Sequence, residues 1–241
     1  QTFSAPEEFD PRPIITVENQ GGQGSCTGHA MTSCVELCDY LETGEKCPEL
    51  SEQWSYITGQ RQSGITGDRG ATISGVVEAA KENGLCRADL APYTGRYYTR
   101  FSREAEEEAR QHRIAQHSVM RDYAACLGWL QSGQGAIVLG ISWTRELANN
   151  RSGEITTRNS GGGRYGGHAL AFLGWDKRGW LWMANSHSER WGNGGWALCE
   201  PAWVDQTIRD RYSEHIGVTD LTENFGKVRK WKPWPDNPFV G

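Results

Sequence analysis

The chain has 241 residues, which is enough for one large domain or for two lobes that share a cleft. Its formal net charge of −5 argues against general nucleic-acid binding, which depends on an excess of basic residues. The longest apolar run, residues 136–143, has the length of a strand and is far too short for a membrane-spanning helix. We therefore expect neither a nucleic-acid partner nor a membrane span.

The first half of the chain is predicted to be helical after an extended start. Prolines in residues 1–25 oppose a helix there. Apolar residues then recur at helical spacing until Gly44, which is typical of a long, buried helix. A later helix is predicted to begin at an N-cap, which is either Thr72 or Ser74. Another predicted helix begins at the N-cap Ser102, has acidic residues in its first turn and carries a charged, solvent-facing surface. Helices are therefore expected over residues 26–41, 50–59, 72–83 and 102–117.

The second half is predicted to form a sheet. A helix over residues 123–130 precedes a continuous apolar run that is typical of a buried strand. Strands are expected over residues 136–141, 169–175, 180–184, 196–198 and 212–218. Helices early and strands late indicate an α+β fold with two segregated lobes.

Two segments lie outside this pattern. Residues 160–167 are rich in glycine but lack the lysine of a phosphate-binding loop, so we expect a flexible loop that sets the approach of His168. Residues 219–241 form a tail that is basic and rich in Trp and Pro. We expect the tail to lie extended across the protein's own surface, with docking to an acidic partner or polymer as the alternative.

A cysteine, a histidine and an asparagine are the candidate catalytic residues. Cys26 follows a glycine-rich loop and begins a predicted helix, where the partial positive charge of the helix N-terminus favours a thiolate. A thiolate attacks a carbonyl carbon when an imidazole, here that of His168, holds it as an ion pair and later protonates the leaving amine. The amide oxygen of Asn185 would orient the imidazole, and the side chain of Gln20 would help to stabilise the oxyanion.

The order of these residues resembles that of the papain-like cysteine peptidases. Further stretches are similar to that family: Leu-Ser-Glu-Gln at 50–53, Asn-Gly-Leu at 83–85 followed by Ala-Pro-Tyr at 91–93, and Trp-Gly-Asn-Gly-Gly-Trp at 191–196. The resemblance covers most of the chain. The Gly-Ser-Cys-Thr-Gly-His-Ala segment at 24–30 is more similar to divergent bacterial or phage members than to plant or lysosomal ones.

The resemblance implies a papain-like two-lobe fold with an active-site cleft between the lobes. A helical left lobe would comprise about residues 14–110, and a β-barrel-like right lobe about residues 111–218 together with the N-terminal strand. It also implies a cysteine-type endopeptidase, which cleaves protein or peptide substrates through a Cys–His ion pair and an acyl-thioester. The substrate-binding residues that it implies are Gly24, Ser25, Gly70, Ala71, Thr72, Gly167, Ala169 and Trp191. Small residues in the main specificity pocket would leave room for a bulky apolar or aromatic side chain.

Several positions depart from the family's pattern. Gln23, Thr58 and the segment 67–70 lack cysteines that form disulfides in most members, and Thr27 stands where most have Trp. His187 replaces a tryptophan that shields the Asn–His hydrogen bond in the family. A wetter hydrogen bond is therefore expected here, and it would weaken the thiolate–imidazolium pair.

The remaining cysteines and histidines carry no second motif. Cys34 and Cys38 share one helical face, but packed thiols or a bridge to a loop such as that of Cys47 fit better than a metal site, because no Cys-x-x-Cys is present. We expect no metal and no cofactor. His29 is expected to be a buried structural histidine. The disulfide pairing stays open among Cys34, Cys38, Cys47, Cys86, Cys126 and Cys199, and no constellation includes His112, His117 or His215.

Two alternative functions remain open. The same thioester chemistry serves amide hydrolases or transferases that act on peptidoglycan stem peptides or glutamine side chains. A catalytically inactive papain-like scaffold, used for binding or assembly, is the alternative from a different class. The chain lacks an initiator Met and begins where mature family members begin, so a processed form is expected. A secreted, extracellular or virion-associated location is the favoured expectation.

Overall fold

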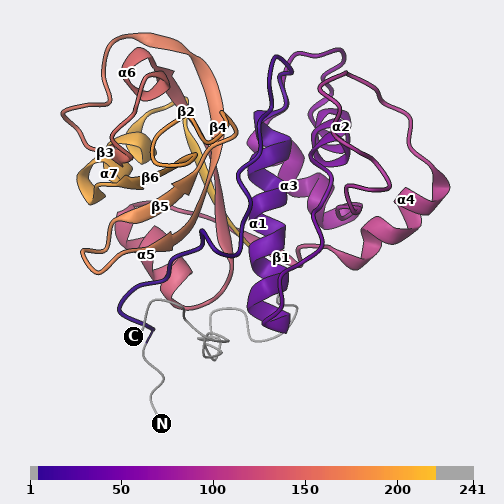
Figure 1. Cartoon of the computed structure of the whole chain (residues 1–241), viewed down its shortest axis with the longest axis horizontal. Helices are drawn as coiled ribbons and strands as arrows, with labels where there is room; N and C mark the ends of the chain where they lie inside the picture. The colour runs from indigo at the N-terminus through magenta and orange to yellow at the C-terminus, as the bar shows by residue number, and fades with distance from the viewer. Residues whose placement is uncertain (1–4, 221–241) are drawn as a thin grey trace.

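The computed structural model describes residues 5–220 as two lobes that pack side by side. One lobe is helical and the other contains the sheet, with the first helix at the boundary between them (Figure 1). The tail expected from residue 219 onward lies outside the described residues apart from its first two positions. Within the described range, no helix is both long enough and apolar enough to cross a membrane.

Three helices build the core of the helical lobe: α1 (Cys26–Thr43), α2 (Glu52–Ser63) and α3 (Ile73–Glu82). Helix α1 packs against α2 on one side and against the sheet on the other, and it is therefore buried on most of its surface. A Cβ atom on Gly28 would lie 2.5 Å from the carbonyl oxygen of Glu52. Glycine at position 28 thus permits the close approach of α2 that fixes the start of α1.

Side-chain caps define where several helices begin. Ser51 accepts a hydrogen bond from the backbone N–H of Trp54, and Thr72 accepts one from Gly75. Ser102 accepts one from Ala105 at the start of α4 (Arg103–Glu108). Each of these bonds satisfies a backbone donor that the helix itself cannot pair. The structure therefore confirms the predicted caps at Thr72 and Ser102.

The other lobe is built on a seven-stranded sheet with the order β1-β7-β2-β4-β5-β6-β3. All neighbouring strands are antiparallel except β3 and β6. The strands are β1 (Gln116–Val119), β2 (Ala136–Thr144), β3 (Glu154–Ile155), β4 (Arg164–Trp175), β5 (Leu181–Ala184), β6 (Trp196–Cys199) and β7 (Glu214–Thr219). The edge strands β1 and β3 do not pair with each other among the described residues, so the sheet is strongly curved but not closed.

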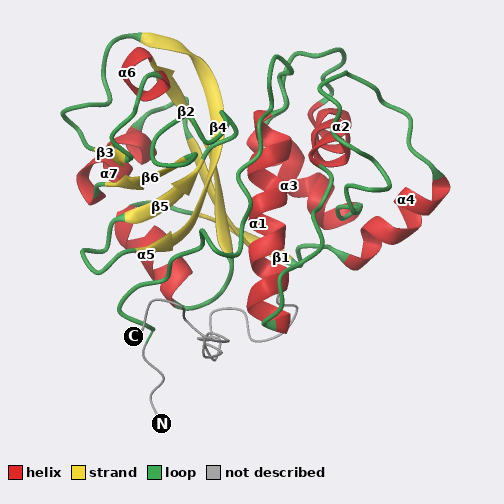
Figure 2. Cartoon of the chain, in the orientation of Figure 1, coloured by secondary structure: helices red, strands yellow, loops and turns green. Residues whose placement is uncertain are grey.

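Three shorter helices surround the sheet: α5 (Tyr123–Gln131), α6 (Arg145–Ala148) and α7 (Pro201–Arg209). Figure 2 shows them on the sheet side of the molecule, while α4 lies at the far edge of the helical lobe. The α+β class and the segregation of helices from strands agree with the expectation from the sequence. The sequence patterns predicted neither α6 nor α7.

Two predicted elements are wrong. The charged helix expected over residues 102–117 ends with α4 and the short 3-10 helix η1 (Ala109–Gln111), and β1 begins at Gln116. Residues 116–119 are extended because they pair with β7, a partner that local charge patterning does not reveal. The glycine-rich loop expected over residues 160–167 is also shorter, since Arg164 already pairs with Thr144 in the β2–β4 ladder.

The structure contains no disulfide among the seven cysteines, which all lie within the described residues. Cys34 and Cys38 are buried thiols in α1, as the packed-thiol interpretation predicted. Packing, rather than covalent cross-linking, therefore joins the helices and loops in the described part of the chain.

Candidate active site

Cys26 is the first residue of α1, the helix that lies at the boundary between the lobes. Its thiol is half-buried and lines an open cavity of about 470 Å³. His168 of β4 lines the same cavity from the sheet lobe. The fold thus brings the nucleophile candidate and the histidine candidate to one space, although they lie far apart in the sequence.

Asn185 holds the ring of His168. The Nε2 atom of His168 lies 2.8 Å from the Oδ1 atom of Asn185, and the two residues are only 7% and 4% exposed. Because a carbonyl oxygen only accepts hydrogen bonds, Nε2 carries the proton in the neutral ring. The lone pair of Nδ1 is therefore the one that can accept a proton from a neighbouring acid.

Aromatic rings cover this hydrogen bond. His187 stacks on His168, with 4.5 Å between ring centroids and 27° between ring planes. Trp143 of β2 packs at the same centroid distance, and Trp191 lies behind Trp143. The low exposure of His168 and Asn185 shows that their bond is dry, so the wetter bond expected from His187 is not found. Trp143 thus covers the hydrogen bond in place of the tryptophan that the family has at position 187. The position of Trp143 over His168 follows from the pairing of β2 with β4.

Gln20 is fixed on both sides of its amide. The Oε1 atom of Gln20 accepts a 2.6 Å hydrogen bond from the hydroxyl of Ser186, and its Nε2 atom donates to the carbonyl of Gln23 at 3.0 Å. The hydroxyl of Tyr93 donates to the backbone carbonyl of Gln20 at 2.7 Å. These bonds set the orientation of the amide and leave one of its two N–H groups for a ligand.

Burial shifts the pKa values of the two reactive groups in opposite directions. Desolvation raises the pKa of the Cys26 thiol, and hydrogen bonds from the backbone, that of Ala169 first, partly offset this effect. Desolvation and the neighbouring His187 lower the pKa of His168 to about 3, against the opposing effect of the Asn185 hydrogen bond. Each group alone therefore favours its neutral form. Transfer of a proton from sulfur to imidazole keeps the net charge unchanged and creates two charges that stabilise each other.

His29 also lies close to Cys26 on α1, but it has a structural environment. Its Nδ1 atom donates to the carbonyl of Ser25 at 3.0 Å, and the residue is 4% exposed. Burial lowers the pKa of His29 to about 4. This arrangement confirms the expectation of a buried histidine that is bonded within the helical lobe.

Most of the predicted substrate-binding residues line the cavity. Those that do are Gly70, Ala71, Thr72, Gly167 and Ala169. Gly24, Ser25 and Trp191 do not belong to the lining. Ser25 is fully buried with its hydroxyl 2.7 Å from that of Tyr93, and Trp191 is 2% exposed with its indole N–H bonded to Leu147. The side chains of Ser25 and Trp191 therefore support the site from within the protein.

The lining also includes residues that the sequence did not single out as site residues. Ile73 and Ile141 contribute apolar walls, and the segment 211–214 at the start of β7 contributes polar and charged side chains. Pairing of β7 with β2 brings this segment to the cavity, since Glu214 lies opposite Gly140. No local sequence signal indicates this placement.

Solved cysteine proteases share the fold of this chain. Xylellain from Xylella fastidiosa superimposes with a TM-score of 0.72 at 20% identity, covering 90% of this chain and 87% of that one. The protease CMS1MS2 from Carica candamarcensis gives a TM-score of 0.68 at 22% identity, with 89% and 98% covered. Bromelain from Ananas comosus gives 0.69 at 18% identity, with 89% and 99% covered.

The comparison at the level of sequence families is more specific than the shared fold. No curated protein sequence matches the chain. The model of the family described as "Papain family cysteine protease" matches residues 5–209, which is most of the chain. The chain is thus a hydrolase of the cysteine peptidase type, and it belongs to the papain family of cysteine proteases.

Proposed function

We propose that the protein is an endopeptidase that cleaves peptide bonds through a thioester on Cys26. The Sγ atom attacks the carbonyl carbon of the substrate while the thiol proton passes to Nδ1 of His168. The C–N bond then breaks as Nδ1 gives this proton to the leaving amine. Water, deprotonated by the same nitrogen, attacks the thioester and releases the acid and the Cys26 thiol.

One observation carries this proposal. His168 shares a cavity with Cys26 while Asn185 holds its Nε2–H, so that Nδ1 is the nitrogen left for proton transfer. Asn185 would keep the ring in this tautomer throughout the reaction. Gln20 would donate its free N–H to the oxyanion, since its other amide atoms are already bonded.

The lining of the cavity supports an apolar preference beside the cleaved bond. Ala71 and Ala169 leave space, and Ile73 and Ile141 supply apolar surface. A large apolar side chain would bury its surface against these residues, which favours binding by about 25 cal/mol per Å². Peptides with Gly or a charged residue at this subsite are expected to be cleaved more slowly.

A peptide library tests the proposed reaction. Mass spectrometry of products from the wild type and from Cys26→Ala should show internal cuts that depend on Cys26 and follow large apolar residues. Release of terminal residues alone would contradict an endopeptidase, and cleavage of purified cell wall in place of peptides would favour the amide hydrolase alternative. No products from either substrate would favour the inactive scaffold.

Replacing Gln20 with Ala should lower kcat by about 100-fold, because loss of one oxyanion donor typically raises the barrier by about 3 kcal/mol. The effect should appear in kcat more than in KM, since the donor acts on charge that develops in the transition state. Steady-state kinetics on a fluorogenic peptide measures both constants. The matched control Gln62→Ala, on the exposed side of α2, should leave kcat within twofold. A change of no more than twofold in the kcat of Gln20→Ala would exclude a role for Gln20 in stabilising the oxyanion.

His187 should weaken activity at acidic pH. Burial lowers the pKa of His187 from its ordinary value of 6.5, so the ring is neutral near pH 7 and gains its charge only below pH 6.5. A charge on His187, stacked 4.5 Å from His168, opposes the imidazolium that catalysis needs. The activity of the wild type should thus fall as the pH drops through the pKa of His187. His187→Phe should shift this acidic limb to lower pH in a kcat/KM profile, and an unchanged limb would contradict this role.

A further inference from the structure

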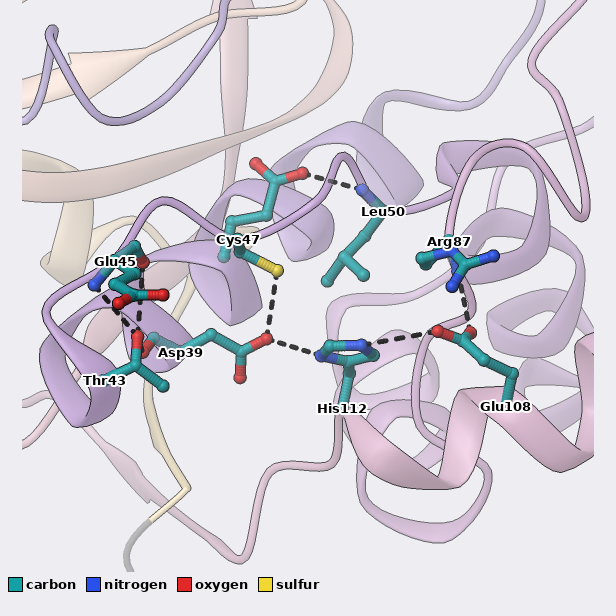
Figure 3. Close-up of polar contacts among 9 residues, drawn as sticks. Asp39, Thr43, Glu45, Cys47, Leu50, Arg87, Glu108 and His112 are labelled. Carbon is teal, nitrogen blue, oxygen red and sulfur yellow. Dashed lines mark hydrogen bonds and ion pairs between the residues drawn. The ribbon is translucent and has the colours of Figure 1, made fainter.

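A second group of chemically reactive side chains lies at the other end of α1. Asp39 lies near the C-terminal end of α1, Cys47 in the loop that follows it, and His112 immediately after η1 (Figure 3). Asp39 is separated from Cys26 by about 20 Å along the helix, given the rise of 1.5 Å per residue. The group is therefore distinct from the cavity that contains Cys26 and His168.

The donor atoms of these three residues converge. The Sγ atom of Cys47 lies 3.1 Å from Oδ2 of Asp39, and Nδ1 of His112 lies 2.5 Å from the same oxygen. One ligand atom from each residue lies within 4.8 Å of the other two. Figure 3 shows the sulfur and the imidazole both directed at the Asp39 carboxylate.

A further carboxylate supports the histidine from its outer side. Oε1 of Glu108 lies 3.6 Å from Nε2 of His112, and its other oxygen accepts a 2.9 Å hydrogen bond from the backbone N–H of Arg87. Metal-ligating histidines usually direct their second nitrogen at a carboxylate or carbonyl, which fixes the ring orientation. Glu108 and His112 have this arrangement.

The combination of donors selects a class of metal. Thiolate and imidazole ligands favour zinc and related transition metals, whereas calcium and magnesium prefer oxygen ligands alone. Zinc binds sulfur at about 2.3 Å and nitrogen or oxygen at about 2.0–2.2 Å, so donors around a tetrahedral ion lie roughly 3.3–3.8 Å apart. Small rotations of Asp39, Cys47 and His112 would bring the observed separations into this range.

A role for Cys47 as a second nucleophile fits less well. Burial and the hydrogen bond to Asp39 raise the pKa of the Cys47 thiol, which opposes a free thiolate. A divalent cation would neutralise the carboxylate charge and replace the thiol proton.

We propose that Asp39, Cys47 and His112 form a zinc site with a fourth position open to water. The ion would join the end of α1, the loop after it and the segment after η1. No disulfide links these segments in the structure, so the metal would supply a cross-link that the described part of the chain otherwise lacks. This site is independent of the proposed peptidase mechanism.

Cobalt and zinc titrations of the full chain test the proposal. The Cys26→Ala background removes the reactive thiol, which could otherwise bind metal itself. Cobalt should give a thiolate charge-transfer band in the near ultraviolet at one equivalent, and zinc should abolish it by displacement. Zinc at a hundredfold excess over Kd should raise Tm by about 5–10 °C.

Variants of the ligands distinguish this site from adventitious binding. In the same background, Cys47→Ser should remove the cobalt band, and Asp39→Asn and His112→Gln should each weaken zinc binding at least tenfold. Glu108→Gln should weaken it by about tenfold through the orientation of His112. Cys126→Ala and His117→Gln, which lie outside the group, should bind as the background does. Circular dichroism with a chelator present reports whether each variant folds.

The absence of a cobalt band in the Cys26→Ala protein would overturn the proposal. A band that persists in Cys47→Ser would do the same, because the thiolate would then come from another cysteine. If Cys47→Ser fails to fold, Asp39→Asn and Glu108→Gln decide the question, and unchanged zinc affinity in both would overturn it.

Discussion

Replacing Cys26 with Ala is expected to lower kcat for peptide hydrolysis by about 10⁴- to 10⁶-fold, which is the range seen when a nucleophile is removed from a comparable catalytic group. The thioester requires the Sγ atom, and none of the other six cysteines, which all lie within the described residues, lines the cavity. The substitution should leave Tm close to that of the wild type, because the thiol is half-buried at the start of α1 and alanine is a strong helix former. Kinetics with a fluorogenic peptide and a thermal melt measure the two quantities.

A matched cysteine variant separates the role of Cys26 from a general effect of thiol loss. Cys126→Ala removes a buried thiol of α5, on the sheet side of the molecule, and should keep kcat within a few-fold of the wild type. Iodoacetamide should modify Cys26 faster than any other cysteine. Activity in Cys26→Ala within tenfold of the wild type would exclude the thioester mechanism.

Replacing His168 with Ala should lower kcat at neutral pH by about 10⁴-fold, because the Cys26 proton then has no acceptor. The residual activity should also acquire a different pH dependence. Burial raises the pKa of the Cys26 thiol above its ordinary value, so without the imidazole the thiolate forms only at alkaline pH. The rate of alkylation of Cys26 in His168→Ala should therefore keep rising above pH 9, whereas the wild type should already react near neutral pH.

The control for this variant is His117→Ala on β1, which does not line the cavity and should match the wild type in rate and pH profile. A His168→Ala protein that reacts with iodoacetamide at neutral pH as fast as the wild type would show that another group accepts the proton. His29 does not fit such a role, since its Nδ1–H is bonded to the Ser25 carbonyl within the helical lobe.

Local signals were sufficient for much of the helical lobe. The end of α1 at Gly44 and the caps at Thr72 and Ser102 depend on contacts within a few residues. Periodicity of apolar residues also located β2 and β5 closely, because their burial leaves a continuous apolar run. These features could be predicted because short-range geometry determines them.

Pairing between strands that lie far apart in the sequence determined several positions that local sequence patterns do not predict. Residues 116–119 carry no strong strand signal and are extended because β7 offers a partner. The same pairing brings the segment 211–214 to the cavity, and the β2–β4 register places Trp143 over His168. Such positions depend on register, which a single sequence specifies only through the whole pattern of burial.

The sequence by itself determined the α+β class, the starts of α3 and α4 and the identity of the candidate residues Gln20, Cys26, His168 and Asn185, because motif spacing and periodicity are local properties. Only the tertiary structure decided that the His168–Asn185 hydrogen bond is dry and that Asp39, Cys47 and His112 converge. Both outcomes arise where separate segments pack together. Packing depends on contacts between residues that lie far apart along the chain, and no short stretch of sequence contains that information.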